Sequence, residues 1–382
     1  MDLSQYRKVE TPLKNKCITI LLLTFLFIFS SNHTVYLHSE GEPELVSEAA
    51  ILINAESGQV LYGKDARKKM YPASITKIVT GIIAIEEGDL EDIVSVSKEA
   101  TKVDGTRVYL LENEEVELRR LVQGLLINSG NDAGFAIAEY ISGTEAAFAI
   151  KMNKFVKNEV GVKDTNFINP HGLFDENHYT TAYDMAKIAQ YAMQNETFRE
   201  IVGTKEMEWN GKGWQTTLQN HNRMLWDYEG ATGIKNGYVS QSGFTLVTSA
   251  EREGLELIVV TLHAPSARYS YKDTKKLLDY GFDHFFTKTF TTDRMYTNTI
   301  GDHFKLEKET IVTIPKDKKI VEEIQGNSLL IKEEGGTTIF KGKLHNLTDS
   351  LEKAETKQVV SEVEMKEQSS HWIWKLIRFF TL

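Results

Sequence analysis

Residues 71–77 read Tyr-Pro-Ala-Ser-Ile-Thr-Lys and stand at the head of a long apolar segment. Apolar residues recur downstream at helical spacing, at Ile78, Val79, Ile82 and Ile83. This pattern predicts a helix from about Ala73 to Gly88. Ser74 and Lys77, three residues apart, then share one helical face. The serine also lies at the positive end of the helix dipole, beside free N–H groups that can bind an oxyanion.

Apolar runs on both sides of this helix predict a sheet built from distant parts of the chain. Runs at 49–54 and 59–62 flank one turn, and runs at 244–249 and 255–262 flank another, so each pair predicts a hairpin. Further helical patterns occupy residues 118–126, 132–140, 144–159, 181–194 and 268–279. We therefore predict an α+β fold, with one mixed sheet closed by its first and last strands and covered by helices.

The mixture of helical and strand patterns gives way to short strand patterns alone beyond about residue 291, so we predict two domains. The first covers residues 45–288. The second, at 291–350, is a small all-β domain, because short β-like pieces are separated there by glycine or charged turns. These pieces lie at residues 311–314, 320–324, 328–331 and 337–340.

The N-terminal end predicts export. A polar, basic stretch precedes the apolar run from Cys17 to Phe29, which is too short for a spanning helix of about 20 residues. We interpret residues 1–39 as a signal peptide, with the best candidate for cleavage near 37–39. A buried core helix and an uncleaved signal anchor stay as alternatives.

The C-terminal end predicts attachment to a membrane surface. Residues 351–368 form a charged spacer, and residues 369–382 form an amphipathic helix. One face of that helix carries cations and the other carries tryptophan, isoleucine, leucine and phenylalanine, as expected for a helix lying among lipid headgroups. Docking on the protein's own body is the alternative. The two ends together predict an exported protein held peripherally at the outer face of the cytoplasmic membrane.

Composition excludes several classes of protein. The chain has 382 residues and a net charge of −10, so it lacks the excess of basic residues expected of a nucleic-acid-binding protein. Cys17 is its single cysteine, which excludes an internal disulfide and a cysteine-bound zinc site. We expect neither a metal nor an organic cofactor, because a serine nucleophile with a neighbouring base needs none.

Two more motifs follow the first in the chain. Ser129-Gly-Asn131 lies between two predicted helices, and Lys235-Asn-Gly237 stands before Tyr238 and the second hairpin. Taken singly, each motif is an ordinary cap or turn. In this order and at these intervals they form the pattern of the penicilloyl-serine transferases.

The chain resembles the low-molecular-mass penicillin-binding proteins that act as serine-type D-alanyl-D-alanine carboxypeptidases. The resemblance extends through nearly the whole chain and includes residues 169–173, 230–238 and 248–254. It implies the fold of β-lactamases and penicillin-binding transpeptidases. It also implies hydrolysis of the terminal D-Ala-D-Ala bond of peptidoglycan stem peptides, which limits cross-linking, and acylation by β-lactams.

The resemblance implies a role for each motif residue. Ser74 would be the acylated nucleophile and Lys77 its general base, while Ser129 and Asn131 would relay protons and hold the peptide amide. Lys235 would attract the terminal carboxylate of the substrate. The remaining substrate-binding positions would be Asn236, Gly237 and Tyr238, with the N–H groups of Ser74 and Tyr238 forming an oxyanion hole. His171 lies in a loop near the site and receives no chemical step.

One position departs from the family. Threonine is usual in the middle of the third motif, where this chain has Asn236. A longer amide side chain predicts altered turnover or substrate preference. It also leaves open a catalytically impaired protein that binds stem peptides or penicillin and acts as a regulator. A β-lactamase is a weaker alternative, because residues 166–173 lack the glutamate that would activate a deacylating water.

Overall fold

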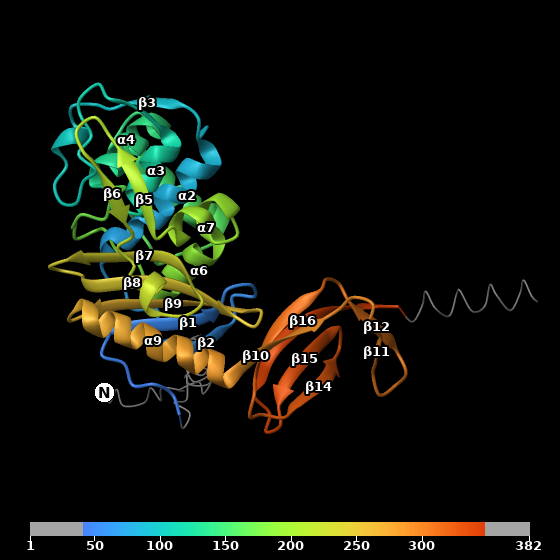
Figure 1. Ribbon diagram of the computed structural model, residues 1–382. Coiled ribbons are helices and arrows are strands. Elements are labelled where there is room, and N and C mark those ends of the chain that lie inside the picture. The colour runs from blue at the N-terminus through green and yellow to red at the C-terminus, as the bar shows by residue number, and fades with distance from the viewer. Residues whose placement is uncertain (1–40, 348–382) are drawn as a thin grey trace, which may run out of the picture. The chain divides into compact units, whose positions relative to one another are not determined.

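The computed structural model describes residues 41–347 of the chain. A five-stranded sheet in the order β2-β1-β9-β8-β7 organises its larger part (Figure 1). The strands are β1 (Ala49–Asn54), β2 (Val60–Lys64), β7 (Ala231–Val239), β8 (Gly243–Arg252) and β9 (Leu255–Ala264). Strand β1 therefore pairs with β9, the last strand of the sheet in sequence, which confirms the predicted closure by distant segments.

All four strand pairings in this sheet are antiparallel, so our expectation of a mixed sheet is wrong in this detail. The short connections between the strands explain this arrangement. Strands β7, β8 and β9 follow one another through tight turns, which can join only antiparallel neighbours. The β8–β9 turn has positive φ at both Glu253 and Gly254, a geometry that matches the twist of a hairpin.

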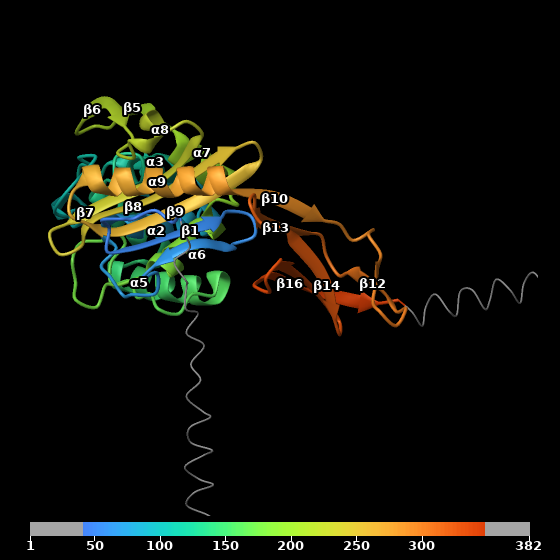
Figure 2. The ribbon, with the colours of Figure 1, turned by 90° about the horizontal axis from the view of Figure 1, so that it is seen from below.

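Both faces of the sheet are covered by helices. In the wholly buried strand β1, Ile51 and Ile53 belong to one core cluster, and Ala50 and Leu52 belong to the other. Such alternation is expected when successive side chains point to opposite faces. Helix α9 (Ala267–His284) covers the face of Leu52, and the remaining large helices lie on the other face (Figures 1 and 2).

The predicted helices are present with small shifts at their ends. A 3₁₀ turn, η1 (Ala73–Thr76), leads directly into α2 (Lys77–Glu87). The others are α3 (Leu118–Leu126), α4 (Asn131–Ser142), α5 (Glu145–Phe155) with a π-helical turn η3 (Val156–Val160), α6 (Ala182–Ala192), α7 (Glu196–Gly203), α8 (Met224–Asp227) and the 3₁₀ turn η2 (Ala100–Lys102). Two small hairpins are formed by β3 (Ile93–Ser95) with β4 (Glu115–Glu117), and by β5 (Glu206–Asn210) with β6 (Gln215–Gln219).

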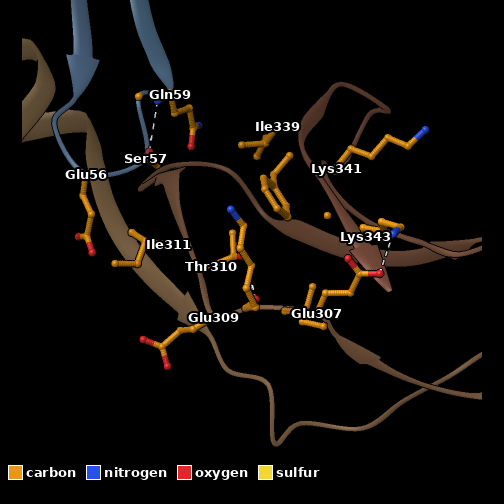
Figure 3. A pocket seen from close by; sticks show the side chains of 15 residues that line it. Glu56, Ser57, Gln59, Glu307, Glu309, Thr310, Ile311, Ile339, Lys341 and Lys343 are labelled. Carbon is orange, nitrogen blue, oxygen red and sulfur yellow. Dashed lines mark hydrogen bonds and ion pairs between the residues drawn. The ribbon is translucent and has the colours of Figure 1, made fainter. Parts of the chain in front are cut away.

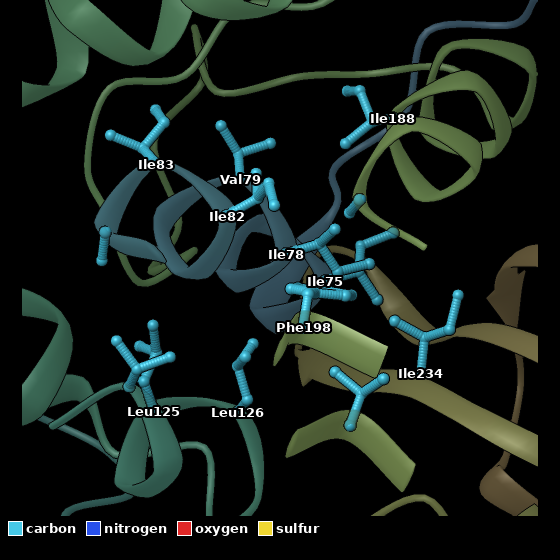
Figure 4. Close-up of a cluster of buried hydrophobic side chains, with 14 of the residues drawn as sticks. Ile75, Ile78, Val79, Ile82, Ile83, Leu125, Leu126, Ile188, Phe198 and Ile234 are labelled. Carbon is cyan, nitrogen blue, oxygen red and sulfur yellow. The ribbon is translucent and has the colours of Figure 1, made fainter. Parts of the chain in front are cut away.

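Helix α2 lies at the centre of the larger core. Every residue from Lys77 to Ala84 is buried, because α3, α4, α5, α6 and α7 all contact this helix. Its isoleucines pack against Leu126, Phe198 and Ile234 from three other elements (Figure 4). A helix surrounded in this way is rigid, so the N-terminal turn that carries Ser74 has a fixed position.

The C-terminal part is all β. A two-stranded sheet pairs β10 (Phe285–Phe290) with β13 (Thr310–Pro315), so strand pairing begins before the expected boundary at residue 291. A five-stranded sheet has the order β11-β12-β16-β15-β14. Its strands are β11 (Tyr296–Thr297), β12 (His303–Leu306), β14 (Ile320–Gln325), β15 (Ser328–Glu333) and β16 (Thr338–Asn346). A separate cluster of apolar side chains fills the space between these strands.

The predicted signal peptide and amphipathic anchor lie outside the described residues, as does the charged spacer at 351–368. Within residues 41–347, none of the helices combines the length and apolar character needed to span a bilayer.

Candidate active site

Ser74 lies in the turn η1 and contacts the side chain of Lys77. The Lys77 Nζ donates to Ser74 Oγ at 2.9 Å and to the backbone oxygen of His171 at 2.6 Å. Ala73, just before the serine, has a φ of 53°, a strained conformation for a residue with a Cβ. A half-buried hydroxyl is thus held against a fully buried amine, which is the arrangement of a nucleophile and its base.

The environment of Lys77 suits it to accept a proton. Burial, followed by the nearby charge of Lys235, holds the pKa of the Lys77 amine well below its usual range, whereas Asp132 acts in the opposite direction. A lowered pKa increases the fraction of neutral amine near neutral pH. Only the neutral form can take the proton of Ser74 Oγ as the oxygen attacks a carbonyl carbon.

The loop at residues 169–173 holds the base in place. Asn169 Oδ1 accepts from the N–H of Gly172 at 2.7 Å, and the loop presents the His171 carbonyl to Lys77. The His171 ring is buried, and its Nε2 lies 2.9 Å from Glu145 Oε1. Burial lowers the pKa of His171, so the ring is neutral and donates this hydrogen bond. The histidine therefore positions the loop through its backbone and its ring.

The second motif lies at the start of helix α4, next to this loop. Ser129 is buried and has a φ of 66°, a second strained position. Asn131 is also buried; its Nδ2 donates to the carbonyl of Asp104 at 2.6 Å and its N–H donates to the carbonyl of Thr106 at 2.7 Å. An added Cβ on Gly134, in the same helix, would lie 3.0 Å from Leu125 Cδ1 and 3.7 Å from the His171 Cβ, so α4 packs closely against the loop at this position.

The third motif lies within the edge strand β7. Lys235 and Gly237 point to the same face and are both buried. An added Cβ on Gly237 would lie 2.6 Å from the backbone nitrogen of Ser74, so glycine is required for this approach. The strand therefore lies directly against the nucleophile turn. Tyr238, the next residue, is more than half exposed.

The protonation state of Lys235 should determine part of the pH dependence of the reaction. Burial lowers its pKa to about 7. The protonated amine is the form that attracts a carboxylate, so binding of a substrate with a free C-terminus should weaken as pH rises through about 7. We expect kcat/KM for such a peptide to fall above this pH, since kcat/KM follows the free enzyme. A peptide with an amidated C-terminus is the control; an equal fall for both peptides would contradict this role for Lys235.

Asn236 contacts the lysine that should face the substrate. Lys235 Nζ donates to Asn236 Oδ1 at 3.1 Å and to the Asn236 backbone oxygen at 3.0 Å. The amide oxygen thus competes with a substrate carboxylate for the same cation. We expect Asn236→Thr to raise kcat/KM for D-alanine release about tenfold or more, the size of one hydrogen bond to a charged group. Unchanged kinetics in this variant would rule out such competition.

Several residues that shape the site gave no recognisable signal in the sequence. Asp132 follows Asn131 and accepts from the backbone N–H groups of Val108 and Leu110 at 3.0 and 3.1 Å. Thr245 Oγ1 donates to the carbonyl of Pro72 at 2.9 Å and joins β8 to the nucleophile turn. Only the adjacency of Asp132 to the second motif could have pointed to the first of these contacts.

Among residues 41–347, no cluster of three or more His, Cys, Asp or Glu side chains is arranged to hold a metal ion. A cavity of about 870 Å³ lies between the β1–β2 turn, residues 306–311 and residues 339–343 (Figure 3). It includes none of the motif residues.

The fold and the site define a serine-dependent enzyme of the penicillin-binding type. The family model for D-alanyl-D-alanine carboxypeptidase matches residues 37–266. The chain is 35% identical over 286 residues to the D-alanyl-D-alanine carboxypeptidase DacF of Bacillus subtilis, covering 72% of each chain. It is 33% identical to DacD of Escherichia coli over 72% of this chain and 75% of that one. Penicillin-binding protein 5 of Haemophilus influenzae superposes with a TM-score of 0.70 at 28% identity, over 81% of this chain and 98% of that one.

This chain therefore belongs to the D-alanyl-D-alanine carboxypeptidase family, which confirms the resemblance seen in the sequence. It is a serine-type carboxypeptidase of peptidoglycan metabolism. The impaired regulator and the β-lactamase are not favoured.

Proposed function

We propose that this protein removes the terminal D-alanine of peptidoglycan pentapeptide stems through an acyl-enzyme on Ser74. Lys77 Nζ takes the proton of Ser74 Oγ, and the oxygen attacks the carbonyl carbon of the penultimate D-alanine. The C–N bond breaks and the terminal D-alanine leaves with a proton. Water then hydrolyses the ester and restores the serine.

The observation that carries this proposal is the hydrogen bond from the buried Lys77 amine to Ser74 Oγ, 2.9 Å long, beside a second buried cation. The leaving group of the reaction bears a free carboxylate. Lys235 supplies a positive charge for that carboxylate. Gly237, two residues further along β7, allows the strand to approach the Ser74 N–H closely. Ser129 and Asn131 would hold the peptide amide and relay the proton to the leaving amine.

β-Lactams should be covalent inhibitors of the same serine, because their strained amide presents an equivalent carbonyl and carboxylate. We place the reaction outside the cytoplasm, at the outer face of the cytoplasmic membrane. The signal-like N-terminal sequence and the amphipathic C-terminal sequence support this location. The proposed substrates, cell-wall stem peptides, are consistent with it.

A paired assay on the wild-type protein tests the proposal. Fluorescent penicillin should label the protein covalently, and a synthetic pentapeptide ending in D-Ala-D-Ala should release D-alanine. Labelling without release would favour the regulatory alternative. Rapid multiple turnover of penicillin would favour the β-lactamase.

A further inference from the structure

Tyr109 has a backbone conformation that favours glycine. Its φ is 58°, yet its side chain is 50% exposed. A tyrosine with this φ carries backbone strain, which persists only where the surrounding structure enforces it. Since half of the residue is exposed, burial does not account for the presence of a tyrosine at a strained position.

The strain has a local cause, which is the carboxylate of Asp132. The backbone N–H groups of Val108 and Leu110 both converge on this carboxylate, and the chain must curl around Tyr109 to present them. Glycine would allow the same curl without strain. The curl therefore explains the φ value but not the choice of a large aromatic residue.

The ring of Tyr109 is held by two neighbours. Trp214 packs edge-on against it with ring centroids 5.3 Å apart, and the Arg107 guanidinium lies over it at 5.2 Å. The β5–β6 turn, which carries Trp214, lies directly on this loop, because an added Cβ on Gly213 would be 2.2 Å from the Tyr109 carbonyl oxygen. Buried Glu114 joins the same two segments through the N–H groups of Leu111 and Lys212, both at 2.8 Å.

This aromatic platform, composed of Arg107, Tyr109 and Trp214, is fixed relative to the second motif. Asp104 and Thr106, just upstream, accept both hydrogen bonds of Asn131. The segment that carries the platform thus contacts the active site at Asn131, whereas the terminal D-alanine is expected beside Lys235. A stem peptide is longer than its two D-alanines, and the rest of it must leave the site past one of the walls.

We propose that Arg107, Tyr109 and Trp214 form a subsite for the part of an acidic stem peptide that lies N-terminal to the D-Ala-D-Ala bond. The inference rests on the proposed function, since it extends the same substrate. Aliphatic stems pack on the aromatic faces, and a carboxylate of the stem faces Arg107. Contacts remote from the scissile bond then increase kcat/KM for long substrates over short ones.

Binding is measured first, in a Ser74→Ala background, so that the result does not depend on turnover. Calorimetry compares an acidic pentapeptide ending in D-Ala-D-Ala with a short acyl-D-Ala-D-Ala. In the parent, the pentapeptide should bind more tightly. Tyr109→Ala should reduce the ratio of the two affinities about tenfold, the size of one lost aromatic contact. The matched control is Tyr269→Ala, which removes an exposed tyrosine on helix α9 and should leave both affinities unchanged.

Two further variants separate a ligand role from a structural one. Tyr109→Gly relieves the strained φ but also removes the contacts of the ring with Trp214 and Arg107. These effects oppose each other, so its thermal midpoint should stay close to that of the parent while the affinity ratio still falls. Arg107→Gln should abolish the difference between the acidic pentapeptide and the same peptide with its side-chain carboxylates amidated. An unchanged affinity ratio in both Tyr109 variants would overturn the subsite. Absence of D-alanine release from the wild type, with these ratios as expected, would refute the proposed chemistry and leave the subsite standing.

Discussion

Ser74→Ala is expected to abolish both D-alanine release and covalent labelling by penicillin. Ser74 Oγ is the hydroxyl to which Lys77 Nζ donates, and alanine removes the atom that would be acylated. In serine hydrolases, loss of the nucleophile lowers kcat by about 10⁶-fold. The fold should be retained, because Lys77 keeps its hydrogen bond to the His171 carbonyl and the serine side chain is small.

Two measurements make this result specific. The thermal midpoint of Ser74→Ala should match the wild type, which shows that the fold is intact. Ser129→Ala keeps the nucleophile and should therefore still be labelled, although more slowly, because Ser129 is expected only to relay a proton. If Ser74→Ala were still labelled at a comparable rate, another residue would be the nucleophile and the proposed mechanism would be wrong.

Gly172→Ala is the second variant with a large expected effect. Gly172 has a φ of 85°, and an added Cβ would lie 1.9 Å from the carbonyl oxygen of Ala73. This contact lies far inside van der Waals distance, so either the loop or the nucleophile turn must move. Such movement also displaces the His171 carbonyl from Lys77 Nζ. We expect at least about a hundredfold loss of D-alanine release, as for a displacement of about 1 Å in a catalytic group.

Gly161→Ala is a matched control for this variant. Gly161 has a similar φ of 80°, but no atom lies within 4 Å of its added Cβ. Both substitutions introduce the same backbone strain, and only the one at residue 172 adds a collision with the active site. A stopped assay of D-alanine release and a thermal melt should show modest destabilisation with normal activity for Gly161→Ala. Equal activity of the two variants would show that the loop does not position the base.

Much of the secondary structure could be predicted because it is a local property. The apolar periodicity after Lys77 indicates helix α2, and the apolar runs at 49–54 and 255–262 indicate strands that the structure pairs directly. Strand β7 was not predicted, since its central residues Gly233 to Gly237 carry little β-branched character. Its conformation depends on pairing with β8 and on packing against the nucleophile turn.

The order of the three motifs in the sequence was enough to identify the site residues. It did not show that these residues lie close together in space. The pairing of Ser74 with Lys77 follows from helical spacing, whereas the approach of Lys235 and Gly237 needs the β7–β8 register and the turn η1. The negative net charge gave no indication of the two lysines that the motifs assign to one substrate, and the burial of both lysines is seen only in the structure.

By itself, then, the sequence determined the helix that carries the nucleophile, the two hairpins and the identity of the three motifs, because periodicity and short spacing are properties of neighbouring residues. Only the tertiary structure decided the wholly antiparallel sheet and the loop at residues 169–173 that binds the base. It also decided the strained Tyr109 beside Trp214. These features depend on contacts between residues far apart in the chain, and such contacts form only when the cores on the two faces of the sheet are packed.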